Sequence, residues 1–158
     1  MATTVFAAYN GFLTAVQAAV TAGTVVYDGP QPTVPTAFDY VVVGCDDVLA
    51  QGPTLAVDNG QRAWIGIMAN AGRHADETFD IYTTVVSSTG SNNLPDCRSR
   101  AAANHAAIEA AVRSDLTLGG ALTGPGWVVG LAVVRVQQIT TAGAAVHMLL
   151  QLACRARV

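Results

Sequence analysis

The clearest hydrophobic pattern in the chain lies at its end. Between residues 144 and 157, apolar and polar side chains alternate, which is the period of a strand with one buried face. The apolar positions are Val146, Met148, Leu150, Leu152 and Cys154, and the polar ones are His147, Gln151, Arg155 and Arg157. A strand over 127–139 precedes it, and the turn sequence TTAG joins the two. The pattern predicts a closing hairpin with one face in the core and the other against water or a neighbouring subunit.

Two segments carry apolar residues at the three- and four-residue spacing of amphipathic helices. The first covers 3–22 and ends at Gly23, a residue suited to helix C-termini. Its apolar face consists of Val5, Tyr9, Phe12, Leu13, Val16 and Val20. The second begins near Pro95 or Asp96, which favour helix starts, and extends to about Leu116. Its stripe consists of Cys97, Ala101, Ile108 and Val112, with His105 on the same side.

The region between the helices is predicted to form strands and loops. TVVYDG (24–29) is a short strand, PQPTVP (30–35) is a connector because proline cannot pair in a central strand, and FDYVVVG (38–44) is a buried strand. Turn-forming residues predict a loop over 45–63. Two further strands are predicted over 64–69 and 77–88, joined by the polar segment NAGRHAD. In the second, Phe79, Ile81 and Val85 share one face, and Asp80 and Thr84 share the other.

The predicted order is helix, strand, strand, hairpin, helix, hairpin. Clustered antiparallel strands with two helices favour the α+β class, as a two-layer sandwich in which a mainly antiparallel sheet carries both helices on one face. A length of 158 residues suits a single domain over 1–158.

Composition indicates a chain that associates with partners. Charged residues make up 12% of the sequence, roughly half of the ~25% in average globular proteins. The formal net charge is −3, and all eight basic residues are arginines. Because phosphate neutralisation supplies most nucleic-acid affinity, a chain without a basic stripe is not expected to bind DNA or RNA tightly.

Membrane insertion and secretion are not expected from the sequence. The apolar run WVVGLAVV (127–134) is broken by Arg135, well short of the ~18 residues of a membrane span. The first ten residues lack the features of a signal peptide. We therefore expect synthesis and folding in the cytoplasm.

Positive support for an enzyme is absent from the sequence. His74, Asp76, Glu77 and Asp80 form the nearest approach to a metal or acid/base cluster, but a solvated hairpin tip is the favoured interpretation. Cys45 follows a buried strand, where nucleophiles occur, although a structural thiol is the better interpretation. The cysteines Cys45, Cys97 and Cys154 are odd in number and widely spaced, so three buried thiols are predicted. No cofactor, metal ligand or catalytic residue is assigned.

The segment RSDLTLGG (113–120) links the second helix to the closing hairpin. Gly119 and Gly120 can take the left-handed conformation that closes a helix. Together with the N-terminal helix, VVYDGPQP followed by FDYVVVG, RHADETFDIYTTVVSSTG, VRSDLTLGG and the final LACRARV, this order of segments resembles the tail terminator proteins of long-tailed bacteriophages, also called tail-completion or head-tail joining proteins. The resemblance spans nearly the whole chain.

The resemblance implies a structural virion protein at the tail or neck, assembled in the host cytoplasm. It implies a ring, usually of six copies, that caps the tail tube, ends its polymerisation and contacts the head-tail connector proteins. Genome DNA would pass through the hole without specific binding, because an acidic ring repels it. Candidate subunit contacts are Arg73, Asp76, Gln151, Arg155 and Arg157; candidate tube or connector contacts are Trp64, Asp46 and Asp47. Two alternatives remain open: another neck or head-completion ring protein, and a small cytoplasmic enzyme that uses Cys45 or the group His74, Asp76 and Glu77.

Overall fold

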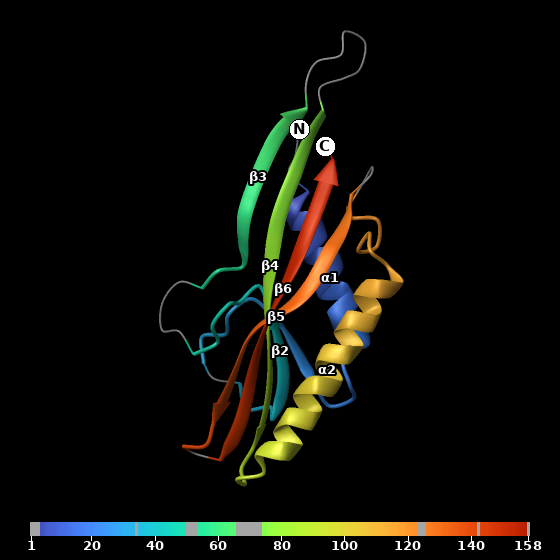
Figure 1. Ribbon diagram of the computed structural model, residues 1–158. Coiled ribbons are helices and arrows are strands. Elements are labelled where there is room, and N and C mark those ends of the chain that lie inside the picture. The colour runs from blue at the N-terminus through green and yellow to red at the C-terminus, as the bar shows by residue number, and fades with distance from the viewer. Residues whose placement is uncertain are drawn as a thin grey trace.

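The computed structural model describes residues 4–33, 35–49, 54–65, 74–122, 126–141 and 143–157. Along the chain the elements are α1 (Val5–Ala19), β1 (Val25–Asp28), β2 (Asp39–Val43), β3 (Val57–Ile65), β4 (His74–Thr89), α2 (Leu94–Ser114), β5 (Trp127–Ile139) and β6 (Ala144–Arg157). Both helices lie on the same side of one sheet (Figure 1). The predicted α+β two-layer sandwich is confirmed.

The sheet is organised around its longest strand, β4. Its strand order is β1-β2-β4-β6-β5, and β3 also pairs with β4. On one side of β4, residues 83–87 pair with β2 and residues 74–81 pair with β3. β6 pairs along the other side of β4. All neighbours are antiparallel except β1 and β2, which are parallel. One edge of the sheet is therefore divided between β1 and β3, whereas β5 forms the whole of the other.

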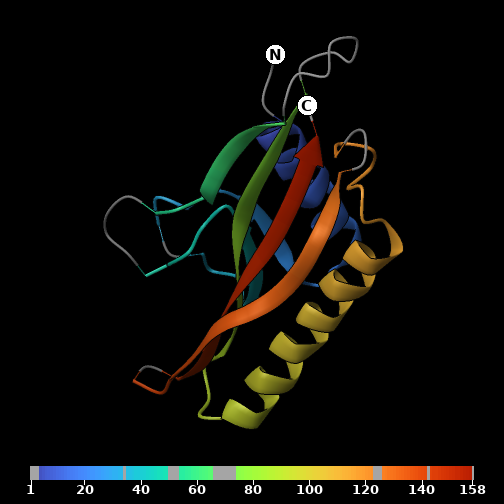
Figure 2. The same cartoon turned by 45° about the horizontal axis from the view of Figure 1, so that its top comes forward.

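The core lies between the sheet and the helices, which Figure 2 shows on one side of the strands. The helix-facing side chains of β4 and β6 follow the predicted alternation, and the three predicted core residues of β4 are buried together with Leu150 and Leu152 of β6. The helices contribute Ala8, Phe12, Val16, Cys97, Ala101, Ile108 and Val112. Both predicted helix faces are thus confirmed, with Ala8 added to the first.

Several boundaries differ from the prediction. Helix α1 covers Val5–Ala19 and so ends three residues before the predicted end. The loop predicted over 45–63 is wrong for its last part, because β3 begins at Val57. The register shifts between Asp58 and Gln61, so a bulge accommodates the turn-forming sequence DNG in an edge strand. β4 begins at His74, three residues before the predicted start. Of the strand predicted over 64–69, residues 64 and 65 belong to β3 and the rest lie outside the described residues.

Helix α2 ends at Ser114, two residues before the predicted end, and a local turn stops it. The Asp115 carboxylate accepts hydrogen bonds from the backbone N–H groups of Thr117 at 2.9 Å and Gly119 at 2.6 Å. These bonds, with the Thr117 hydroxyl as the main cause, lower the pKa of Asp115. Gly119 and Gly120 have φ of 71° and 79°, as predicted. The turn brings the Leu118 carbonyl so close to Gly11 of α1 that any Cβ there would lie 2.3 Å from the oxygen.

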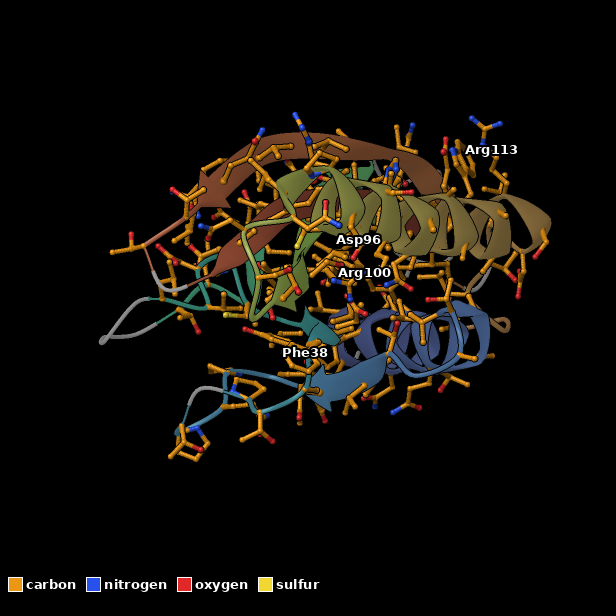
Figure 3. All side chains as sticks on the ribbon, turned by 90° about the horizontal axis from the view of Figure 1, so that it is seen from below. Phe38, Asp96, Arg100 and Arg113 are labelled. Atoms are coloured by element: carbon orange, nitrogen blue, oxygen red, sulfur yellow. The ribbon has the colours of Figure 1, made fainter. Side chains whose placement is uncertain are left out.

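Polar side chains fix both helices to the sheet. Glu77 of β4 is buried, and its Oε2 accepts hydrogen bonds from the Thr4 backbone N–H at 2.9 Å and the Thr4 hydroxyl at 2.7 Å. It thereby places a carboxylate at the positive end of α1, which has no acidic residue in its own first turn. At the start of α2, the Arg100 guanidinium pairs with Asp39 of β2 and with Asp96, and donates to the Ser88 carbonyl at 2.8 Å (Figure 3).

Asn104 is the buried polar residue of α2. The helical stripe predicted His105 on the buried side, but His105 is half-buried, whereas Asn104 is only 1% exposed. Its Oδ1 accepts from the Thr21 N–H at 3.0 Å and the Thr21 hydroxyl at 2.9 Å, and its Nδ2 donates to the Thr24 hydroxyl at 3.1 Å. Asn104 thus joins α2 to the segment between α1 and β1.

Replacing Asn104 with alanine is expected to lower the free energy of unfolding by about 1–3 kcal/mol, because it removes the hydrogen bonds that its buried amide makes to Thr21 and Thr24. Urea denaturation followed by circular dichroism measures the change. Ser99→Ala, at an exposed position of the same helix, is the matched control and should change stability by less than about 0.5 kcal/mol. Equal effects of the two substitutions would contradict the role given to Asn104.

Candidate functional site

The candidate functional site is the outer edge of β5. In the described residues β5 pairs only with β6, so the backbone N–H and C=O groups along its other side have no strand partner. Register shifts between Val128 and Gly130 and between Val133 and Arg135 interrupt the ladder. Such bulges bend and twist a strand but do not remove its free hydrogen-bonding groups. An unpaired edge of this length is a template for another strand.

Apolar side chains line this edge on both faces of the strand. The exposed fractions are 41% for Trp127, 63% for Val129, 42% for Val133, 51% for Val134 and 48% for Val136. They are five of the eleven large hydrophobic side chains that are exposed among the described residues. Because helix α2 lies mainly over β4 and β6, nothing from the second layer covers the later part of β5. Exposed apolar groups concentrated on one element mark an interaction surface.

Arg135 is the one charged residue of β5. Its charge does not protect the unpaired edge. Its guanidinium turns to the loop after β2, where it donates to the Asp46 carbonyl at 3.2 Å and lies 3.8 Å from the Asp47 carboxylate. Edge strands of monomeric proteins are usually protected by outward charges or proline. Here the available charge is held against the chain's own loop.

Two predicted contact residues pair with each other on the face away from the helices. The Arg155 guanidinium lies 2.6 Å from the Asp76 carboxylate and 5.7 Å from the centre of the Trp127 ring. The ion pair joins β6 to β4, and the ring contact extends it to the start of β5. The cation therefore reaches toward the open edge while its ion pair remains within the subunit.

The other predicted contact residues are distributed over the sheet. Gln151 is half-buried on β6, opposite Ala132 of β5. Arg157 pairs with Asp76 in the backbone register, and Trp64 of β3 pairs with Ala75. Arg73 lies outside the described residues. In the backbone register, Arg157 and Trp64 lie beside Asp76 at one end of the sheet, whereas Gln151 lies nearer its middle.

Asp46 and Asp47 shape the loop that follows β2. The Asp46 carboxylate accepts from the Leu55 N–H at 2.8 Å, and the Asp47 carboxylate accepts from the Leu49 N–H at 2.9 Å. This loop covers part of the sheet face opposite the helices. Beneath it, His147 is only 8% exposed, and burial lowers the pKa of its imidazole. The expectation that His147 lies on a face open to water or a neighbour is therefore wrong, because the loop supplies the cover.

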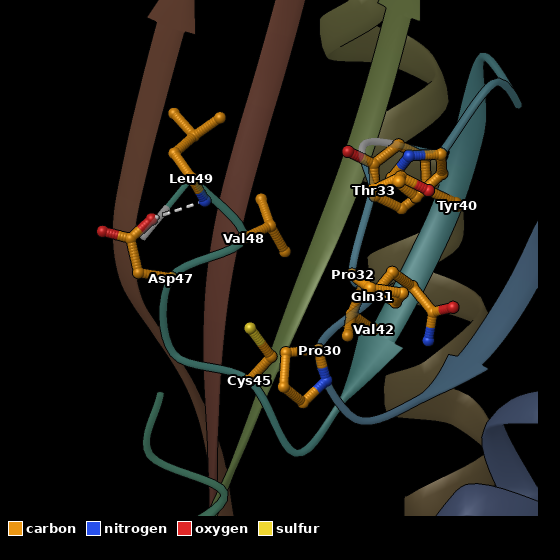
Figure 4. Close-up of a pocket in the computed structure, with 11 residues that line it drawn as sticks. Pro30, Gln31, Pro32, Thr33, Tyr40, Val42, Cys45, Asp47, Val48 and Leu49 are labelled. Carbon is orange, nitrogen blue, oxygen red and sulfur yellow. Dashed lines mark hydrogen bonds between the residues drawn. The ribbon is translucent and has the colours of Figure 1, made fainter. Parts of the chain in front are cut away.

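A cavity of about 470 Å³ lies between this loop and the proline-rich connector (Figure 4). Its lining includes Pro30, Pro32, Tyr40, Val42, Cys45 and Val48. Cys45 is 0% exposed, and burial raises the pKa of its thiol. A buried, neutral thiol is a poor nucleophile. The cavity therefore lacks an activated cysteine.

In the group His74, Asp76, Glu77 and Asp80, the three carboxylates do not converge, and the His74 side chain lies outside the described part of the structure. Glu77 faces the helices and binds Thr4, whereas Asp76 and Asp80 lie on the opposite face of β4. Within the described residues, no three histidine, cysteine, aspartate or glutamate side chains are placed to hold a metal ion. No described helix combines the length and apolar character that crossing a membrane requires.

The open edge was not recognised in the sequence, although a signal was present. WVVGLAVV is apolar at consecutive positions, whereas a strand with one solvated face alternates. A continuous apolar strand fits either a central strand or an edge strand that another molecule covers. The strand order places β5 at the edge.

No family model and no curated protein matches the chain. Among solved structures, a chain of the structure described as "Virion of native gene transfer agent (GTA) particle" is similar, with 16% sequence identity and a TM-score of 0.36. The match covers 94% of this chain and 92% of that chain. A TM-score of this size does not establish a shared fold.

All three thiols are buried, and we expect them to resist alkylation in the native protein. Burial raises the pKa of Cys45 and raises that of Cys154 to about 12, so both are neutral thiols at pH 8. Iodoacetamide should label them at least about a hundredfold more slowly in buffer than in denaturant, because labelling requires local opening. Intact mass spectrometry follows the reaction. An added exposed thiol, Ser99→Cys, is the positive control, and rapid labelling of native Cys45 would contradict the prediction.

Proposed function

We propose that this chain is a structural virion protein of a long-tailed bacteriophage or phage-like particle. Copies close into a ring, of six subunits in this proposal, that sits on the tail tube and ends its polymerisation. The ring presents the surface to which the head-tail connector proteins dock, and genome DNA passes through its hole without specific binding.

The open edge of β5 is the observation that carries the proposal. A strand of 13 residues whose outer side has no strand partner among the described residues, with apolar side chains on both faces, is prone to aggregation in a lone subunit. In an assembly, the same strand supplies backbone hydrogen bonds and apolar burial together. A ring uses heterologous contacts in which one patch meets a different patch on the next copy. The low charge content of the chain suits such permanent contacts.

The resemblance to tail terminators supplies the specific role. The segments that carry it correspond to α1, to β1 and β2, to β4, to α2 with its terminal turn, and to β5 with β6. The β5 edge therefore supports assembly in general, and the sequence resemblance supports a tail-terminator ring in particular.

The enzyme alternative has less support. Cys45 is fully buried with a raised pKa, and Glu77 lies on the opposite face of β4 from Asp76. Nothing in these arrangements presents a nucleophile or a paired acid and base to a substrate. Another neck or head-completion ring would use the same kind of subunit contact, so its partner distinguishes it.

Addition of the purified protein to polymerising tail tube protein should stop tube growth, with a ring visible at one tube end. Electron microscopy of tube lengths over time measures the effect, and native mass spectrometry gives the number of copies in the ring. We expect growth to cease once the rings equal the tube ends in number, because each ring covers one growing end. An unrelated protein of similar size at the same concentration is the control.

Rings that leave tube growth unchanged but bind connector or portal proteins would assign the chain to another position in the neck. A chain that remains monomeric with both tube and connector components present would end the proposal.

A further inference from the structure

The two edges of the sheet run in opposite directions. β3 and β6 are both antiparallel to β4, and β5 is antiparallel to β6. β5 is therefore antiparallel to β3. When neighbouring copies stand the same way up, as around a ring axis, the β5 edge of one copy meets the β3 edge of the next as an antiparallel pair. This is the stronger ladder geometry.

The free parts of the two edges also lie at the same level of the sheet. Leu131 of β5 pairs with Leu152, which pairs with Ile81, which pairs with Val57 of β3. Likewise, Trp127 pairs with Arg155, which pairs with Thr78, which pairs with Gln61 of β3. Segments 127–131 and 57–61 therefore occupy the same rows at opposite edges. A rotation about an axis close to the strand direction, without a shift along it, would bring these two segments together.

The charges of the two edges are complementary. The β5–β6 hairpin, residues 127–157, contains Arg135, Arg155 and Arg157 and no acidic residue. The strands of the other edge, β1, β2 and β3, contain Asp28, Asp39 and Asp58 and one arginine, Arg62. Asp58 lies directly opposite Asp80 in the β3–β4 ladder, so two carboxylates lie on one face near this edge. Arg135, Arg155 and Asp39 already have ion-pair partners within the subunit, so this difference in charge content favours head-to-tail contacts over contacts between two identical edges only through the longer-range field.

We propose that the β5 edge of one copy adds as an antiparallel strand to the β3 edge of a second copy, so that the sheet continues from subunit to subunit. The inference rests on the proposed ring and names the contact that builds it. Val129 and Trp127 cover the neighbour's segment 57–61. Arg155, held over the Trp127 ring, lies in the row of the neighbour's Gln61 and brings positive charge to the face of the sheet away from the helices, the same face as Asp58.

The β1 edge and a second β5 edge are the competing partners. β1 has only four residues, and its Asp28 carboxylate already accepts a hydrogen bond from the Tyr9 hydroxyl at 2.6 Å. β3 offers nine residues. Pairing of β5 with β5 would bring together two hairpins that contain arginines and no acidic residue of their own.

Cysteine crosslinking tests the pairing directly. The double variant Val129→Cys with Gln61→Cys, treated with a short bismaleimide crosslinker, should give covalent species larger than a dimer, up to the full ring. The native thiols are buried and should not contribute. Each single variant should stay uncrosslinked. Dimers from Val129→Cys alone would overturn the proposal in favour of β5 with β5. A ladder from Val129→Cys with Val25→Cys, in place of the β3 pair, would overturn it in favour of β1.

The second test introduces a charged side chain at the β5 edge. Val129→Lys should raise the protein concentration needed for assembly at least about tenfold, because outward lysines block strand addition. Val25→Lys makes the same change at an exposed valine of β1 and should leave assembly unchanged. Thermal unfolding checks that both variants fold. Assembly of Val129→Lys at the wild-type concentration would overturn the pairing.

Crosslinking and tube assays together separate the two proposals. Rings that stop tube growth without β5–β3 crosslinks overturn the pairing and leave the tail-terminator role intact. Closed rings joined by β5–β3 crosslinks that do not affect tube growth support the pairing and overturn the role.

Discussion

The antiparallel pairing of β4 with β6 is the interaction on which the rest of the structure depends. The register extends without interruption from Asp76 and Arg157 to Thr89 and Ala144. It places Phe79, Ile81, Leu150 and Leu152 on the helix-facing side. A slip of one residue would turn these side chains to the other face. β2 and β3 are attached to one side of this pair and β5 to the other, so its register also fixes the relation between the two edges of the sheet.

The helix layer is fixed to that pair by a few buried polar groups as well as by apolar packing. Glu77 supplies the negative charge that α1 lacks in its own first turn, and Asn104 joins α2 to the chain that follows α1. Hydrogen bonds are directional, so these groups specify one position of each helix, whereas apolar contact alone tolerates sliding. A rigid helix layer keeps the sheet and both of its edges in one shape.

The sequence predicted the parts of the fold that depend on local periodicity. The alternation of β6, the core face of β4 and the two helical faces are confirmed because each depends on neighbours within one element. β3 was missed because its bulge tolerates Asp58, Asn59 and Gly60, whose local preference is a turn. The cover over His147 was missed because it comes from a loop about a hundred residues away in the chain. The open edge of β5 depends on strand order, which no local pattern encodes.

The charge distribution explains why an unprotected edge persists in this chain. A protein that must remain a monomer places lysine or another charge along such an edge, and this chain has no lysine and turns Arg135 toward its own loop. An edge that has to receive a neighbour must instead stay free of outward charge. The same edge would build an open filament unless the rotation between copies closes. The bulges in β5 and in β3 increase the local twist of the two strands that would meet. In the proposed ring, this twist would contribute to the rotation from one copy to the next, on which closure depends.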